Sequence, residues 1–246
     1  MKKKLIISLA LLVIIVLGIW YYKSHKNNSS YVAPETPQEE QKQTLPKLSI
    51  ETKDIKEENF TGKVAVVSGD SVLAEKANAY IESAIADFKK QADTDVPAMR
   101  KEFGADSPTA QYEIDIDAKD VKSSETESIV LLVYTYTGGA HGSSVYKVFT
   151  VDADSKIMSL SSIVKAGQEK AFTEFVKKEL LKWKPSGDVS PVFPEDVDAL
   201  TFNSFGNWAL TDTTLIIYFD QYAVGPGALG AVPFSISLDK IKNFLN

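Results

Sequence analysis

Cysteine is missing from all 246 residues, and histidine occurs only twice. Without a thiol the chain has no disulfide, no thiolate nucleophile, no cysteine-ligated zinc and no lipid-modified N-terminal cysteine. His25 lies in a polar stretch, so His141 is the one histidine in the region whose pattern indicates folding. No HExxH motif surrounds it, which argues against a helical zinc site. The sequence therefore predicts no metal and no cofactor.

Basic residues are scarce outside the N-terminus. The formal net charge is -6, yet the first 26 residues hold five lysines and no acid, which leaves -11 for the rest. An acidic domain repels phosphate backbones and attracts basic partners. We therefore expect no nucleic-acid partner.

Residues 5–22 form one long apolar run without charge, LIISLALLVIIVLGIWYY. About 20 such residues cross a bilayer core as a helix. Lys2–Lys4 precede the run, so the positive-inside rule places residues 1–4 in the cytoplasm and the remainder outside. A cleaved signal peptide is the alternative, but the run exceeds the usual apolar length and no small-residue cleavage site follows. The sequence predicts a single-pass membrane anchor.

Residues 23–47 are polar and contain proline, which is typical of a flexible linker. Periodic patterns begin after it. Alternation predicts strands at 48–55, 63–67, 111–121, 128–137, 145–151, 205–210, 214–219 and 232–237, and spacings of three and four predict helices at 73–91, 169–183 and 238–245. Strands that follow strands favour antiparallel pairing. The expected class is α+β, with two long amphipathic helices, a short C-terminal helix and two associated lobes, 48–155 and 156–246.

Two glycine-rich segments, YTYTGGAHGSSVY (134–146) and DQYAVGPGALG (220–230), each follow an apolar strand. Glycine permits a positive φ and close backbone approach, so exposed N–H groups there can receive a ligand. A demanding turn with no ligand is the simpler alternative for either segment. The residues expected to contact a ligand are Tyr136, Gly138, Gly139, His141, Gly142 and Tyr222.

A hydrolytic triad could be drawn from Ser143 or Ser144, His141 and Asp220. Neither serine lies in a GxSxG elbow, so nothing in the sequence specifies that geometry. We predict no catalytic residue, and keep a hydrolase that uses His141 as an alternative.

The segments YTYTGGAHG (134–142), VFTVDADSKIMSLSSIV (148–164) and IIYFDQYAVGPGALGAVPFSISLDKIKNFL (216–245) resemble a bacterial extracytoplasmic family of unknown function. That family is shared by the anti-sigma factor and lysozyme receptor RsiV and the N-terminal region of the peptidoglycan deacetylase PdaC. The resemblance covers 48–246 and implies an α+β fold of two subregions that meet near residues 150–156.

The same resemblance implies a binding or sensing element at the cell envelope. Only residues 1–4 precede the apolar run, too few to hold a sigma factor, so none is expected as a partner. No residues follow 246 to form a deacetylase domain, so that activity is not expected either. The predicted ligand is a protein, lysozyme-like proteins included, or a cell-wall glycan. A structural or assembly role is the remaining alternative.

Overall fold

A computed structural model describes residues 48–105, 107–185 and 191–246. The predicted cytoplasmic N-terminus, membrane anchor and linker, residues 1–47, lie outside the described residues. Among the helices that the structure describes, none combines the length and the apolar character needed to cross a bilayer.

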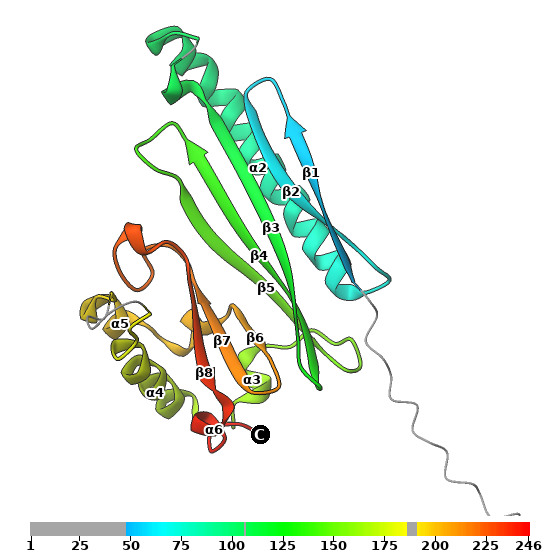
Figure 1. Ribbon diagram of the computed structural model, residues 1–246, viewed down its shortest axis with the longest axis vertical. Coiled ribbons are helices and arrows are strands. Elements are labelled where there is room, and N and C mark those ends of the chain that lie inside the picture. The colour runs from blue at the N-terminus through cyan, green and yellow to red at the C-terminus, as the bar shows by residue number, and fades with distance from the viewer. Residues whose placement is uncertain (1–47, 106, 186–190) are drawn as a thin grey trace, which may run out of the picture. The chain divides into compact units, whose positions relative to one another are not determined.

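The first sheet has five strands in the order β1-β2-β3-β4-β5. Figure 1 shows them along one side of the long helix α2. The strands predicted at 48–55 and 63–67 are present as β1 and β2, and they pair antiparallel, as expected, from Ser49↔Ser68 to Lys56↔Thr61. Only β2 and β3 run parallel, since α2 connects them. The strands are β1 (Ser49–Lys56), β2 (Phe60–Ser68), β3 (Tyr112–Lys122), β4 (Thr126–Thr137) and β5 (Ser143–Asp152).

Helix α2 (Val72–Phe103) covers one face of this sheet. Ser71 caps its start by accepting a hydrogen bond from the Ala74 N–H. The prediction that the helix ends at residue 91 is wrong, because it runs twelve residues further, through Pro97, to Phe103. Ala92 and Val96 are fully buried against the sheet, and this packing outweighs the hydrogen bond lost at proline.

The second sheet has three antiparallel strands, β6 (Trp208–Leu210), β7 (Thr214–Phe219) and β8 (Val232–Ser237). The segments before, between and after its strands are α3 (Leu160–Ile163), α4 (Glu169–Leu181), α5 (Pro194–Ala199), the 3₁₀ turns η2 (Phe202–Phe205) and η3 (Gly227–Leu229), and α6 (Leu238–Ile241). A further 3₁₀ turn, η1 (Pro108–Ala110), precedes β3.

Two boundaries in this half differ from the prediction. The strand expected from residue 205 begins at Trp208, because a capping box of Thr201 and Ser204 closes a 3₁₀ turn first. The C-terminal helix ends at Ile241 instead of 245, since Leu245 forms a bridge with Val164. Sequence patterns gave no signal for α3 and α5, which are too short for a helical period to show.

Buried side chains form one core on each side of the contact between the sheets. One core lies between α2 and the first sheet, and another between the second sheet and α4 with α5. A smaller cluster joins the facing sheets and comprises Val121, Val130, Val148, Ala209 and Tyr218. The predicted α+β class is confirmed. The division into lobes at residue 155 stays a prediction.

Candidate functional site

The two glycine-rich segments lie against each other although they are about 80 residues apart. Tyr222 and His141 are joined by a hydrogen bond of 3.1 Å between the phenolic oxygen and Nε2. Beside this pair, the Gln221 amide oxygen accepts from the Ser144 N–H, and the Gln221 N–H donates to the Ser144 carbonyl. The segments therefore build one surface. We call the six predicted contact residues, Tyr136, Gly138, Gly139, His141, Gly142 and Tyr222, the loop surface.

The hydrogen bonds of His141 define its tautomer. Nδ1 lies 2.9 Å from the carbonyl oxygen of Gly142, which can only accept, so Nδ1 carries the proton. In the neutral ring Nε2 then accepts from the Tyr222 hydroxyl. Tyr222 is 53% exposed and its backbone has a φ of 70°. A side chain held by a hydrogen bond while its ring faces solvent is suited to contacting a ligand.

Two of the three glycines of the loop surface, Gly138 and Gly142, are required by packing. Gly138 has a φ of 81°, and a Cβ there would meet the carbonyl oxygen of Thr109 at 2.1 Å. A Cβ on Gly142 would lie 2.3 Å from the Tyr134 ring. The hydroxyl of Tyr136 donates to the Gly139 carbonyl over 2.9 Å, which fixes the Tyr136 ring against the turn.

The residues of the alternative triad are not joined by hydrogen bonds. Both ring nitrogens of His141 contact Gly142 and Tyr222 instead of a serine or an acid. The Asp220 carboxylate accepts from the Tyr146 N–H at 2.7 Å. Asp220 thus fixes the edge of β5. In the described ranges no three acidic or histidine side chains gather as metal ligands would.

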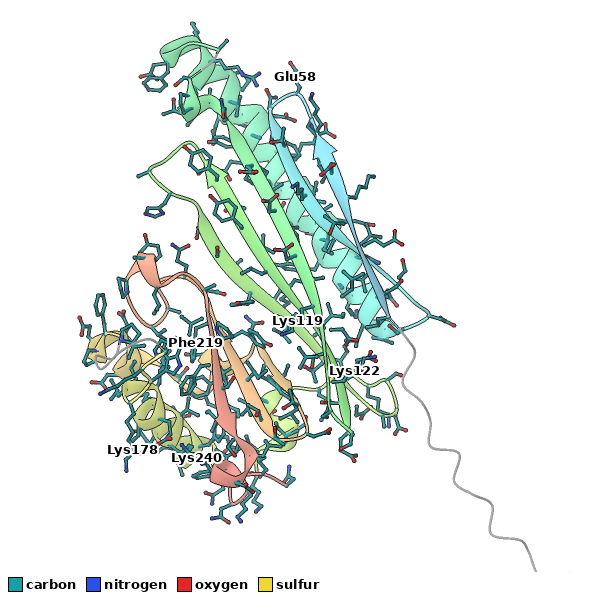
Figure 2. The ribbon with its side chains drawn as sticks, in the orientation of Figure 1. Glu58, Lys119, Lys122, Lys178, Phe219 and Lys240 are labelled. Atoms are coloured by element: carbon teal, nitrogen blue, oxygen red, sulfur yellow. The ribbon has the colours of Figure 1, made fainter. Side chains whose placement is uncertain are left out.

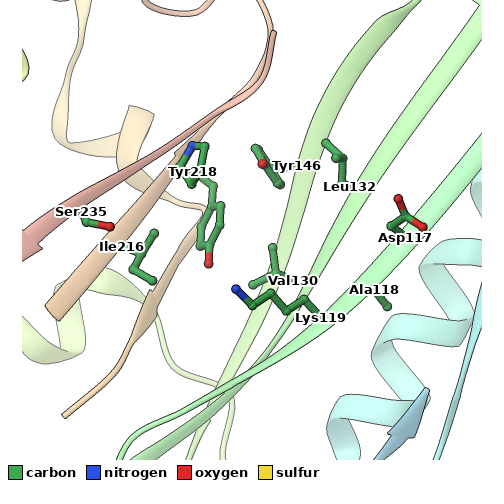
Figure 3. A pocket seen from close by; sticks show the side chains of 10 residues that line it. Asp117, Ala118, Lys119, Val130, Leu132, Tyr146, Ile216, Tyr218 and Ser235 are labelled. Carbon is green, nitrogen blue, oxygen red and sulfur yellow. The ribbon is translucent and has the colours of Figure 1, made fainter. Parts of the chain in front are cut away.

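A groove of about 410 Å³, which the sequence patterns did not indicate, opens where the two sheets diverge (Figure 3). Its walls come from β3, β4 and β5 on one side and from β7 and β8 on the other. The rings of Tyr146 and Tyr218 pack at its base with centroids 4.9 Å apart. The other lining residues are Asp117, Ala118, Lys119, Val130, Leu132, Ile216, Pro233 and Ser235.

Burial shapes the chemistry of the two tyrosines. The pKa of Tyr218 is raised to about 12, because burial disfavours the phenolate and Tyr146 lies beside it. Burial raises the pKa of Tyr146 as well. Both hydroxyls therefore stay protonated at neutral pH, so they can donate hydrogen bonds.

A second hollow, of about 430 Å³, lies between α4 and β8 and is basic. Lys182, Lys184 and Lys240 line it together with Trp183. Figure 2 marks Lys240 on α6, below β8. Among the described residues that line it, Glu179 is the only acid, and it accepts hydrogen bonds from Lys182 and Lys240 at 2.7 and 2.8 Å. These two ammonium groups hold the pKa of Glu179 below its ordinary value.

Comparison with known proteins divides the chain into two matched regions. Residues 51–144 match the family described as "Deacetylase PdaC", and residues 161–239 match "Protein of unknown function (DUF3298)". The peptidoglycan-N-acetylmuramic acid deacetylase PdaC of Bacillus subtilis (strain 168) is 27% identical over 172 residues, which cover 68% of this chain. The match spans only 37% of that relative. The resemblance seen in the sequence is confirmed.

Solved structures show the same fold. A DUF3298 family protein from Pseudomonas aeruginosa PAO1 has a TM-score of 0.56 at 15% identity, and the match covers 83% of this chain and 96% of that one. A member of the same family from Bacteroides fragilis NCTC 9343 has a TM-score of 0.55 at 14% identity, with 82% and 94% covered. At such identities the likeness concerns the fold alone.

Proposed function

We propose that this chain, which joins a PdaC-type region to a DUF3298 region, is a membrane-anchored extracytoplasmic module that binds cell-wall glycan. The observation that carries the proposal is the pairing of Tyr222 with His141 across two distant segments. It presents a half-exposed aromatic ring in a fixed orientation. Aromatic rings with a polar edge suit sugars, which offer apolar C–H faces and hydroxyl groups.

Two further observations support this ligand and location. The Bacillus subtilis relative is a peptidoglycan deacetylase, as its name states, and 172 of its residues align with this chain. The apolar run at residues 5–22 is long enough to hold the folded part at the outer side of a membrane.

The test is co-sedimentation of the purified full chain with insoluble peptidoglycan. Tyr222→Ala should lower the bound fraction strongly, because it removes the exposed ring and the partner of His141. Phe103→Ala is the matched control, since Phe103 is 56% exposed but lies at the far end of α2. Equal retention of all three proteins would refute the loop surface as the glycan site.

A protein ligand is the alternative that the charge favours, because the chain beyond residue 26 is acidic. The protein ligand would be favoured over glycan by two results together. The chain would bind a basic lysozyme, with weaker binding in Tyr222→Ala, and it would not co-sediment with peptidoglycan. The hydrolase alternative has its own readout, release of soluble fragments from peptidoglycan. If the fragments are no longer released by His141→Ala, and its free energy of unfolding equals that of the unmodified chain, catalysis would be established. An assembly role would be favoured if the unmodified chain and Tyr222→Ala both retained the same envelope protein in stoichiometric amount.

The anchor is tested separately by fractionating cells that express the full chain. We expect the protein in the membrane pellet and its C-terminal half accessible to protease added outside. Recovery as a soluble cytosolic protein would overturn the location.

A further inference from the structure

Strand β8 is an edge strand of the second sheet. The register shows which of its backbone N–H and C=O groups point toward β7 and which point away from the sheet. The Tyr218 N–H donates to the carbonyl of Asn207, on the β6 side of β7. Because neighbouring residues of a strand point their N–H groups to opposite sides, the backbone N–H and C=O groups of Ile217 and Phe219 point toward β8. Their register partners Phe234 and Val232 therefore use their backbone groups for the hydrogen bonds between β8 and β7.

The intervening residues Pro233, Ser235 and Ser237 consequently point their backbone groups away from the sheet. Proline in this register fits, because it has no N–H to offer and is tolerated where the strand edge is free. Among the described residues, no hydrogen bond reaches the outward backbone groups of Pro233 or Ser235, whereas Ser237 already serves as the N-cap of α6. The outer edge of β8 is thus unpaired in the described part of the chain.

This edge lies between the two hollows. Ser235 lines both the groove between the sheets and the basic hollow. Figure 3 shows its side chain at the rim of the groove. A strand added to β8 would send alternate side chains to opposite faces of the sheet. One set would enter the groove, near Leu132 and Tyr146, and the other set the basic hollow.

The chemistry of the two hollows selects the added strand. The basic hollow has three lysines against one glutamate, in a chain whose net charge is negative. Acidic side chains on that face would be attracted. The groove is lined by valine, leucine, isoleucine and two tyrosines besides one acid and one lysine, which suits apolar side chains.

We propose that the free edge of β8 binds an extended peptide segment of a partner protein, in which acidic and apolar residues alternate. Backbone hydrogen bonds to Ser235 and Pro233 supply affinity, and the two hollows supply sequence preference. The added strand also covers part of the first sheet that no helix covers. This site is distinct from the loop surface, so it stands independently of glycan binding.

The probe is a fluorescent peptide of about six residues that alternates glutamate and valine, titrated into the full chain. Ser235→Pro removes the outward N–H, and the edge tolerates proline at Pro233 already. We expect this variant to bind about tenfold more weakly, the equivalent of one or two lost hydrogen bonds. Ser235→Ala is the matched control, because it keeps the N–H, and should bind as the unmodified chain does.

Two further arms keep the proposal testable if Ser235→Pro unfolds. A peptide methylated on the amides that face β8 cannot donate to the Pro233 and Ser235 carbonyls and should bind at least tenfold more weakly. A peptide with lysine in place of glutamate should also bind weakly, and added salt should weaken the glutamate peptide. Equal binding of the methylated or the lysine peptide would overturn the proposal. Tyr222→Ala should leave peptide binding unchanged, which separates this site from the loop surface.

Discussion

Asn207 closes the free edge of β5 at Val148. Its side-chain oxygen accepts from the Val148 N–H at 3.1 Å, and its nitrogen donates to the Tyr146 carbonyl at 2.9 Å. Asp220 and Gln221 satisfy the next groups along the same edge. The second half of the chain thus does with side chains what a sixth strand would otherwise do, and covers the edge of β5 from Ser144 to Val148 against pairing with other chains.

Replacing Asn207 by alanine should destabilise the fold by roughly 2 to 3 kcal/mol, because two partly buried backbone groups lose their partner. Urea denaturation followed by circular dichroism measures this change. Asn203→Ala is the control, since Asn203 is exposed and its side chain makes no hydrogen bond in the described structure. A loss at Asn207 no larger than at Asn203 would show that water replaces the amide without cost.

Local patterns sufficed for much of the fold. Alternation located the strands of both sheets, and spacings of three and four located the helices α2 and α4. The predicted helix ended at residue 91, although Ala92 and Val96 continue the helical spacing beyond Phe88. Beyond them α2 passes through Pro97, where burial against the sheet outweighs the lost hydrogen bond, and a local pattern does not show that burial.

The candidate site also has parts that the sequence predicted and parts that it did not. Glycine content picked out both loop segments, and the structure brings them together at His141 and Tyr222. The groove was not foreseen, since Tyr146 and Tyr218 come from distant strands of different sheets. The role of Asn207 could not be predicted either. An asparagine that bonds a backbone about 60 residues away leaves no periodic trace.

Gly138 and Gly104 offer a matched pair for separating backbone strain from crowding. Both have a positive φ, 81° and 94°, but only Gly138 has backbone where a Cβ would go. Gly104→Ala should cost about 1 to 2 kcal/mol for the conformation alone, because a φ of 94° with a ψ of 153° is readily adopted only by glycine. Gly138→Ala should cost roughly 3 kcal/mol, because the Thr109 carbonyl must move as well. The free energies of unfolding in urea give both values, and equal values would mean that the loop shifts freely.

Alkaline pH should destabilise the fold through Tyr218. Its pKa is about 12 in the folded protein against 10.0 ordinarily, so the unfolded chain releases this proton first. The stabilisation is complete below pH 10 and declines as pH rises toward 12, by up to roughly 2.5 kcal/mol.

Tyr218→Phe should flatten this decline, while the stabilities of both proteins run parallel between pH 7 and about 9. Urea unfolding measured at a series of pH values from about 7 to 12 tests both expectations. Part of the decline should remain. Burial and a hydrogen bond to Asp95 also raise the pKa of Tyr112 to about 12. An unchanged slope in Tyr218→Phe would assign the alkaline loss to other groups.

Glu127 is the buried charge whose partner is most critical. Its side chain on β4 is inaccessible to solvent and pairs with Lys122 of β3, which also contacts Asp120 at 3.2 Å. Lys122→Met removes the ammonium and leaves a buried carboxylate uncompensated, at an expected cost of about 3 to 5 kcal/mol. The double variant Lys122→Met with Glu127→Leu removes both charges and should recover most of that loss.

Lys156→Met is the control for this pair, because Lys156 and Asp154 form an ion pair on the surface, with side chains 74% and 65% exposed. It should leave the free energy of unfolding almost unchanged, because solvent screens an exposed ion pair. If Lys122→Met costs as little as Lys156→Met, the Glu127 carboxylate is reached by water and the buried pair does not hold β3 and β4 together. If the double variant is no more stable than Lys122→Met, packing around the two side chains matters more than their charges.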